Sequence, residues 1–414
     1  MCPPPPLTSD PSQAFLLGVA ELLHAYGTPA FRLERVLVNV ARDLSVEASF
    51  LSTPTAVIAS IGSAPNKVVH LMRADSGEVD LGKLVEFDEA MDQVRDRELT
   101  PSEGLARIEE VAAAPSRYPR WIKAVAFGTA SSGAAIFFHG GWPEVLFTFL
   151  ASQLTFALAR RSSRGSDAVG LFEPIAAFLT AVAAALASGW FGLDVRIVTL
   201  AGLVVLLPGL TLTVGFIELA TRHLVSGMAR LAGAGAVFLT LLFGVALGWR
   251  VGALLLGVEP GLGGAFLPAR TTVALASGWV WAAVATAPFA FGIVLEARRS
   301  ELGVIFLASA SGYLAARLGA DVLGPDLGPF LGALVVGLVA NTYARLVDRP
   351  ALVPLTPGIF MLVPGSLGFR SLTSFLDADS MAGMTWAFQT GLVAISLVGG
   401  LLLANLVLPP RRVL

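Results

Sequence analysis

Hydrophobic and polar positions follow two different periods in the first quarter of the chain. Apolar residues recur at the spacing of an amphipathic helix over residues 14–26, 31–44, 81–94 and 101–113. Three short apolar runs bounded by turn residues predict β-strands over residues 46–51, 55–61 and 68–72. These patterns predict a small α+β domain over residues 14–116. Residues 1–13 contain a run of prolines and no apolar signal-peptide segment, so we expect a disordered lead there.

From residue 117 onward the apolar runs are much longer. A helix needs about 20 largely apolar residues to cross a bilayer. Ten segments approach that length: 121–138, 142–159, 171–189, 197–219, 228–249, 272–295, 303–318, 330–346, 352–369 and 383–408. The pattern predicts an α-helical polytopic membrane protein with ten transmembrane helices in a lipid bilayer.

Two motifs recur within these spans at almost the same offset. Phe-Leu-Ala-Ser at 149–152 returns at 306–309, and Leu-Pro-Gly at 207–209 returns as Val-Pro-Gly at 363–365. The offsets predict one repeat of five helices over 117–250 and a second over 251–414. Because five is an odd number, the second repeat must be inverted relative to the first, which is typical of secondary transporters.

Composition and charge support the same division. Hydrophobic residues make up 55% of the chain and charged residues only 14%, whereas soluble domains contain about 25% charged residues. This excludes an ordinary soluble enzyme, and the net charge of −2 gives no basis for a nucleic-acid partner. Residues 1–116 hold 9 basic and 17 acidic residues, so the predicted domain is acidic.

The distribution of basic residues predicts the orientation. If the N-terminal domain is cytoplasmic, 14 Lys and Arg residues flank the inner ends of the spans and five occupy the outer loops. The outer five are Arg196, Arg250, Arg270, Arg317 and Arg370. We therefore expect a multi-pass protein of the bacterial inner (plasma) membrane with both termini cytoplasmic. No charged residue falls at the centre of a span, so the pattern predicts no buried cation.

The fourth and ninth spans are each interrupted by a Pro-Gly pair. Proline removes a helix hydrogen bond and glycine adds backbone freedom, so each pair favours two half-helices over one continuous helix. The start of a half-helix inside the membrane would direct N–H groups and partial positive charge at a carboxylate. The alternative is a packing kink without a ligand. The substrate-binding candidates here are Pro208, Gly209, Thr211, Thr213, Pro364, Gly365 and Ser366.

Other polar residues in the spans are weaker candidates. The amides of Gln153, Asn341 and Gln389 could bind substrate, although hydrogen bonds between helices are their more common role. The carboxylates near span ends, Glu173, Glu218 and Asp377, are either proton-coupling groups or solvated side chains. The single cysteine and four scattered histidines match no metal-ligand or catalytic spacing, so we expect no metal, cofactor or catalytic residue.

One glycine stripe carries a separate expectation. Gly324, Gly328 and Gly332 form a small-residue stripe that predicts close helix packing. Such stripes also allow self-association, so a homo-oligomer is a further expectation.

Three stretches of sequence resemble the threonine/serine exporter family. They are residues 22–34 (LLHAYGTPAFRLE) with 52–55 (STPT), residues 207–213 (LPGLTLT), and residues 226–231 (SGMARL). The resemblance covers nearly the whole chain, as a cytoplasmic domain and two related membrane halves fused in one chain. It implies export of small hydrophilic amino acids, threonine and serine, driven by protons. Split relatives are linked to succinate export instead.

These observations favour a secondary active exporter of threonine or serine that works by alternating access. A dicarboxylate exporter is the alternative within the same architecture. An alternative of another class is a cytoplasmic sensor or enzyme domain on a membrane scaffold. Ten spans with two broken helices exceed what an anchor requires, which disfavours the scaffold.

Overall fold

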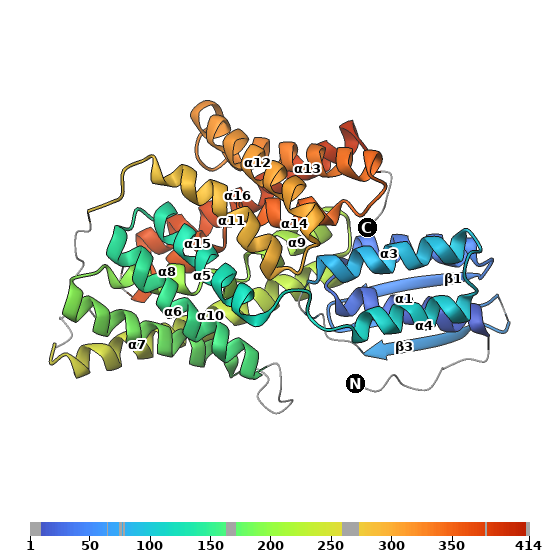
Figure 1. The fold of residues 1–414 in the computed structure, drawn as a ribbon, viewed down its shortest axis with the longest axis horizontal. Coiled ribbons are helices and arrows are strands. Elements are labelled where there is room, and N and C mark those ends of the chain that lie inside the picture. The colour runs from blue at the N-terminus through green and yellow to red at the C-terminus, as the bar shows by residue number, and fades with distance from the viewer. Residues whose placement is uncertain are drawn as a thin grey trace.

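The computed structural model describes residues 10–63, 65–73, 77, 79–162, 171–258, 273–376 and 379–410. An N-terminal α+β domain lies at one end of the molecule, and helices of the remaining chain form the other part (Figure 1). The two parts contact each other through α3 of the domain, which faces segments that join helices, and through the start of α2, which contacts α9.

The domain contains the seven predicted elements. Its helices are α1 (Pro11–Ala25), α2 (Ala30–Asp43), α3 (Leu81–Arg95) and α4 (Pro101–Ala113), and its strands are β1 (Ala48–Thr53), β2 (Ala56–Ile61) and β3 (Val68–Arg73). The helix α1 begins before the predicted boundary, so residues 11–13 are helical and do not belong to a lead. Asp10 caps this helix, because its carboxylate accepts a hydrogen bond from the Ser12 amide. Pro11 occupies the first turn, where proline is favoured.

The strands form one antiparallel sheet in the order β1-β2-β3. Ile61 at the end of β2 pairs with Ala48 of β1 and with Val68 of β3. Alternate residues of β2, among them Val57 and Ala59, are buried in the same core as Phe15 of α1. The sheet therefore buries one face under the helices of the domain.

The helical part divides at residues 259–272, which lie outside the described ranges. Before that point it contains α5 (Arg120–Phe137), α6 (Trp142–Ser162), α7 (Phe172–Phe191), α8 (Val195–Gly202), the short 3₁₀ helix η2 (Val204–Leu206), α9 (Gly209–Ala220) and α10 (Leu224–Leu255). After it come α11 (Trp279–Val294), η3 (Arg299–Glu301), α12 (Leu302–Leu323), α13 (Gly328–Leu346), α14 (Leu352–Phe360), α15 (Gly365–Leu376) and α16 (Ser380–Val407). Each predicted span thus falls on one helix or on a broken pair.

Fewer helices than predicted meet a strict test of length and apolarity. Among the described residues, six segments are long and apolar enough to cross a membrane, and a seventh results if the bent pair of α8 and η2–α9 is one span. The six are Phe172–Phe191, Leu224–Leu255, Arg299–Leu323, Gly328–Leu346, Leu352–Leu376 and Ser380–Val407. The helix α11 has only 16 residues. The protein is a polytopic membrane protein, and the number of ten spans stays a prediction.

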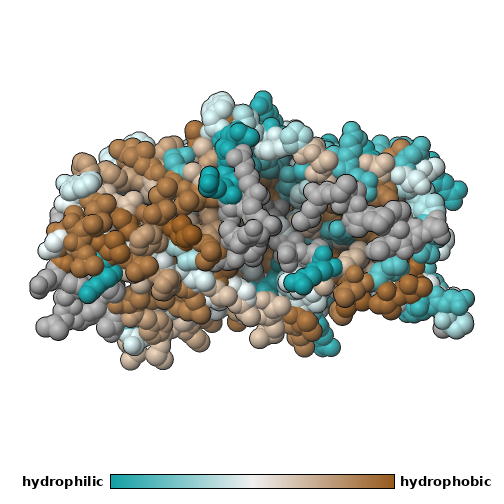
Figure 2. Space-filling model, turned by 90° about the horizontal axis from the view of Figure 1, so that it is seen from below, coloured by the Kyte–Doolittle hydropathy of each residue, from teal (hydrophilic) through white to brown (hydrophobic). Residues whose placement is uncertain are grey.

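The surface agrees with a membrane location for the helical part. Figure 2 shows apolar side chains over most of that part, whereas hydrophilic side chains are more frequent over the N-terminal domain. Large apolar residues such as Trp190, Phe243 and Leu254 are more than half exposed on α7 and α10. In water such a surface would be unfavourable, whereas in a bilayer it faces lipid tails.

Glycine stripes allow helices of the same chain to pack closely. A Cβ on Gly244 or Gly248 of α10 would approach backbone carbonyl oxygens of α7. Gly328 and Gly332 of α13 face α12 in the same way, as predicted. The prediction was wrong for Gly324, which has a φ of +89° and ends α12 with no packing neighbour. Because these stripes are occupied within the chain, they give no separate support for a homo-oligomer, which stays a prediction.

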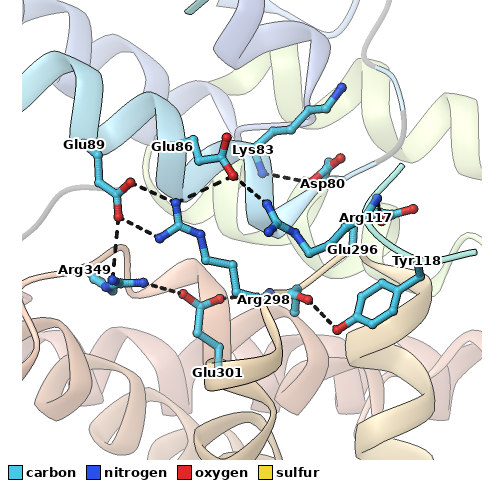
Figure 3. A network of polar contacts seen from close by, with 11 residues as sticks. Asp80, Lys83, Glu86, Glu89, Arg117, Tyr118, Glu296, Arg298, Glu301 and Arg349 are labelled. Carbon is cyan, nitrogen blue, oxygen red and sulfur yellow. Dashed lines mark hydrogen bonds and ion pairs between the residues drawn. The ribbon is translucent and has the colours of Figure 1, made fainter. Parts of the chain in front are cut away.

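Ion pairs join the domain to the helical part (Figure 3). The Arg298 guanidinium, between α11 and η3, donates to both carboxylate oxygens of Glu89 on α3 at 2.7 and 2.8 Å. Arg349, which precedes α14, lies 3.6 Å from Glu89 and 3.0 Å from Glu301. The hydrogen bond from Arg298 holds the pKa of Glu89 below its ordinary value, so this carboxylate is ionised at neutral pH.

A second set of contacts surrounds Glu296, just after α11. Lys123 lies 2.6 Å from its carboxylate, Ser116 donates to it at 2.5 Å, and the Arg117 amide donates at 3.0 Å. Burial raises the pKa of Glu296, but these hydrogen bonds outweigh it and leave the pKa below its ordinary value. The linker between the domain and α5 is thereby fixed to the segment that follows α11.

We expect Arg298→Ala to weaken the docking of the domain, because it removes the bidentate pair with Glu89. The loss should lower the free energy of unfolding by about 1 kcal/mol, measured by thermal unfolding of the purified protein in detergent. The control is Arg107→Ala, whose pair with Glu110 is exposed within α4. An equal effect of both variants would contradict a special role for Arg298.

Candidate functional site

The two Pro-Gly pairs meet in space, although 156 positions separate them along the chain. Pro208 precedes α9, which begins at Gly209, and Pro364 precedes α15, which begins at Gly365. A Cβ on Gly365 would lie only 3.2 Å from the Cα of Gly209. Both glycines are buried, so the starts of the two half-helices contact each other inside the helical part.

Local sequence explains each break. Leu207 is extended, with ψ 128°, as expected of a residue before proline, and Pro208 cannot continue the hydrogen bonds of the preceding turn. One turn earlier, the segments Val195–Gly202 and Val204–Ala220 meet at Leu203 with a bend of 47°. The α14–α15 span is likewise interrupted before Pro364.

A cavity of about 150 Å³ lies at this crossing, and we call it the central cavity. Both breaks contribute to its wall through Leu207, Gly209, Val363, Gly365 and Ser366. Small and aromatic residues of α5 and α11 also line it, including Ala130, Ala134, Ala287 and Phe291. Helix N-termini have partial positive charge, so two of them at one cavity favour a carboxylate there.

A larger cavity of about 470 Å³ lies between the membrane part and the N-terminal domain, and we call it the domain-side cavity. Helices α9 and α14 line it through Leu210, Ile217, Leu355 and Ile359, among others. The loop before α2 and the first turns of α2 face it from the domain, through Gly27, Pro29, Phe31, Arg32 and Arg35. Leu210 also lines the central cavity, so one side chain lies between the two.

Arg32 is the buried cation of the domain-side cavity. It is only 7% exposed, and burial, together with the charge of Arg35, lowers its pKa to about 10. It remains protonated at neutral pH. The domain therefore contributes positive charge to this cavity despite being acidic as a whole.

A third cavity, of about 150 Å³, lies on the other side of the crossing, and we call it the far cavity. Helices α8 and α15 line it through Arg196, Ile197, Leu200, Phe369, Arg370 and Thr373. Phe138 lines both this cavity and the central one. Figure 1 shows α9 and α14 nearer the domain, and α8 and α15 farther from it.

The predicted substrate-binding residues separate into two groups. Gly209, Gly365 and Ser366 line the central cavity, and Pro208 and Pro364 precede the half-helices there. Thr211 and Thr213 do not line it. The hydroxyl of Thr213 is buried and donates a hydrogen bond to the Gly209 carbonyl at 3.1 Å, so its hydrogen bond is made within α9.

The three predicted amides lie outside the cavities. Gln153 donates to the Ala124 carbonyl of α5 at 3.1 Å, and Asn341 donates to Asn405 of α16 at 2.9 Å. Both therefore join neighbouring helices, the alternative role noted for them from the sequence. Gln389 is half-buried on α16 and lines none of the three cavities.

The three carboxylates have different environments. Glu173 is half-buried in the first turn of α7, and Asp377 lies outside the described residues. Glu218 of α9 is fully buried, contrary to the solvated position considered from the sequence. It accepts hydrogen bonds from Ser226 at 2.7 Å, Arg230 at 3.1 Å and the Ala30 amide at 2.9 Å. It thus joins α9 and α10 to the start of α2.

Sequence reasoning missed the arginines near the crossing. Arg370 was assigned to an outer loop, but it lies in α15, half-buried, because the helix continues beyond the predicted end of the span. Arg196 lies in α8. Both side chains are half-buried, so these two cations lie within helices beside the predicted spans and not in loops. The signal was the helical spacing of Phe369, Arg370 and Thr373, which places these residues on one face.

The fold and the cavities define a polytopic membrane protein with two broken spans that cross at its centre and a soluble domain docked at one end. Sequence profiles identify the family. The profile described as "Putative threonine/serine exporter" matches residues 14–252, and that described as "Threonine/Serine exporter, ThrE" matches residues 279–407. The chain belongs to the threonine/serine exporter family, in its fused two-half form.

Curated relatives include proteins of several yeasts. The chain is 29% identical over 388 residues to Pheromone-regulated membrane protein 10 of Eremothecium gossypii, covering 89% of this chain and 50% of the relative. The corresponding protein of Candida albicans is 26% identical, with 92% and 35% covered, and Uncharacterized protein C7D4.12c of Schizosaccharomyces pombe is 26% identical, with 86% and 47% covered. The chain spans one third to one half of these relatives' length. They give no support for a bacterial membrane in particular. No solved structure matches the chain.

We expect Gly209→Ala to disrupt the crossing, because its Cβ would lie 2.0 Å from Val363 Cγ1 and 3.1 Å from the Gly365 Cα. The overpacking should cost about 1–3 kcal/mol, measured by thermal unfolding in detergent. Gly235→Ala in α10 is the control, because nothing lies within 4 Å of its Cβ. Its helix should be unaffected or slightly stabilised. A neutral Gly209→Ala would show that the two backbones do not touch.

Proposed function

We propose that the protein is a secondary active exporter of small hydrophilic amino acids of the threonine and serine class, working by alternating access. The observation that carries the proposal is the meeting of both Pro-Gly breaks at one cavity, with a further cavity on each side. Family membership supports transport over the alternative of a sensor or enzyme domain on a scaffold. The docked domain also lines the domain-side cavity, which favours a direct role in the pathway.

The arrangement of the half-helices supports inverted repeats. The fourth helical segment of the first half and the fourth of the second half are both broken. The later piece of the broken segment in the first half is α9, and the earlier piece of the one in the second half is α14. Both line the domain-side cavity. The remaining pieces, α8 and α15, line the far cavity. Such an exchange of early and late pieces is what an inversion produces.

The mechanism follows from the chemistry of the central cavity. The solute carboxylate would lie against the first turns of α9 and α15, with the Ser366 hydroxyl as a hydrogen-bond partner. Leu210 would close the way to the domain and Phe138 the way to the far cavity. Rocking of one half against the other would open these barriers in turn, so that the solute faces one side at a time.

Proton coupling is part of the proposal. Of the candidate carboxylates in the described residues, Glu218 lies nearest the pathway, because its neighbour Ile217 and the nearby Thr221 line the domain-side cavity. Its partners Arg230 and Ser226 belong to α10, and the Ala30 amide belongs to the domain. Protonation of Glu218 would weaken the contact between domain and α9 as the domain-side cavity changes shape.

We further propose a cell-membrane location with the domain in the cytoplasm, since Arg117, Arg298 and Arg349 gather at the domain end. Export of a dicarboxylate is the second candidate. The observation in its favour is the pair of arginines lining each outer cavity, Arg32 with Arg35 and Arg196 with Arg370.

Counterflow in proteoliposomes tests the function. With unlabelled serine trapped inside, we expect uptake of labelled threonine by the full-length protein and none by protein-free vesicles. Trapped succinate should not drive threonine uptake. Exchange of succinate alone would replace the proposed substrate with a dicarboxylate, and exchange of neither solute class would overturn the proposed function.

The central cavity is tested by Ser366→Ala. Loss of one hydrogen bond to the solute should raise the KM about 3- to 10-fold, with the amount of folded protein unchanged on size-exclusion chromatography. Ser311→Ala is the control, because the Ser311 hydroxyl donates to the Leu307 carbonyl of its own helix at 2.6 Å. Equal KM values for Ser366→Ala and wild type would remove Ser366 from the site.

A further inference from the structure

We propose that a surface groove between α12 and α13, at the domain-side end of the helical part, binds a phospholipid. The phosphate would lie at the polar end of the groove and an acyl chain along its apolar walls. We call this groove the lipid groove. It lies apart from the three cavities described above, so the proposal does not depend on the identity of the transported solute.

The walls of the lipid groove are apolar and open to the outer surface. Its volume is about 660 Å³, larger than that of the central or the domain-side cavity. Leu307 and Leu346 in its lining are more than half exposed, so the groove opens on a surface that faces lipid tails. The apolar lining residues are Val304, Leu307, Leu338, Val339, Leu346 and Val347. From Glu301 to Leu307 the groove follows the helix for about 9 Å, at 1.5 Å per residue.

The polar end of the lipid groove lies where the helical part meets the domain. Ser300, Glu301 and Arg349 line this end, and the last two belong to the ion pairs with α3 of the domain (Figure 3). In a bilayer, this end would lie at the level of the lipid headgroups, because the walls beyond it are apolar. The groove therefore matches both parts of a phospholipid, a polar head and an apolar chain.

The hydroxyl of Tyr343 is independent evidence for a ligand. Tyr343 lines the groove and is only 9% exposed. Its hydroxyl is buried and has no hydrogen-bond partner among the described residues. Buried tyrosine hydroxyls normally form a hydrogen bond, because an unpaired one loses its bond to water without replacement. A phosphate or ester oxygen of a lipid at the polar end would accept this bond.

The charges at the polar end allow a phosphate to bind without a free cation. Arg349 donates to Glu301 at 3.0 Å and lies 3.6 Å from Glu89. A guanidinium has five N–H donors, so these two contacts leave donors for a further acceptor. The carboxylate of Glu301 is compensated, because it also accepts the Arg298 amide at 3.3 Å. A bound phosphate would share Arg349 with the two carboxylates, so the lipid and the domain would contact the same arginine.

Native mass spectrometry of the full-length protein in detergent, titrated with dioleoyl phosphatidylglycerol, tests the site. We expect one tightly bound lipid per chain of the wild type. Tyr343→Phe removes only the hydroxyl and should weaken lipid binding about 3- to 10-fold. Val339→Trp fills the apolar part of the groove and should abolish binding.

Each variant has a matched control. Tyr313→Phe also removes a tyrosine hydroxyl from this region, but Tyr313 packs on Phe137 and does not line the groove. Leu247→Trp adds an indole at an exposed position of α10, away from the groove. Both controls should bind the lipid as the wild type does. Size-exclusion chromatography and thermal unfolding without added lipid check that all four variants are folded.

Two further probes separate the parts of the ligand. Dioleoylglycerol has the same chains without a phosphate, and glycerol phosphate has the phosphate without chains; neither should displace the phospholipid. Equal affinities of Tyr343→Phe and wild type, or equal binding of dioleoylglycerol, would overturn the phosphate end of the site. Displacement by glycerol phosphate would replace the lipid with a free phosphate compound and overturn the proposal. Counterflow of threonine is measured separately, so each of these results leaves the proposed transport function standing.

Discussion

Contact between two glycine backbones at the crossing of the broken spans is the constraint on which the rest depends. Helices with ordinary side chains stay about 8–10 Å apart, whereas Gly209 and Gly365 allow the starts of α9 and α15 to touch. This contact brings two helix N-termini to one point. It also divides the space along the spans, so that one cavity lies at the contact and one on each side of it.

The N-terminal domain is part of this arrangement. Its α2 supplies Arg32 and Arg35 to the domain-side cavity, and the Ala30 amide at the start of the same helix binds Glu218 of α9. Separate ion pairs from α3 hold the domain to the second half. A movement of either half would therefore change contacts of the domain, because the domain contacts both halves.

Much of the fold could be predicted from the sequence, because its signals are local. Apolar periodicity located all seven elements of the domain within a few residues. The Pro-Gly pairs at 208–209 and 364–365 located the breaks, since a proline removes a helix hydrogen bond and favours the end of a helix. The sequence could not show that Gly209 and Gly365 touch, because that contact joins distant positions. Nor could it show that Glu218 is buried, since its partners Ala30 and Arg230 come from two other elements. Arg370 was missed because hydropathy ends a span at a charge, whereas α15 continues as a helix through it.

The contacts between the two halves have a consequence for how the chain is assembled. Phe137 of α5 packs on Tyr313 of α12, and Trp142 of α6 packs on Trp279 of α11 at 4.6 Å. With the glycine crossing and the ion pairs of the domain, these contacts join the halves at several separated places. The halves are thus joined by many non-covalent contacts in addition to the peptide chain that connects them. Two polypeptides that each carry one half would contain every surface needed to associate into the same particle, with the soluble domain acting as an adaptor that selects the correct partner.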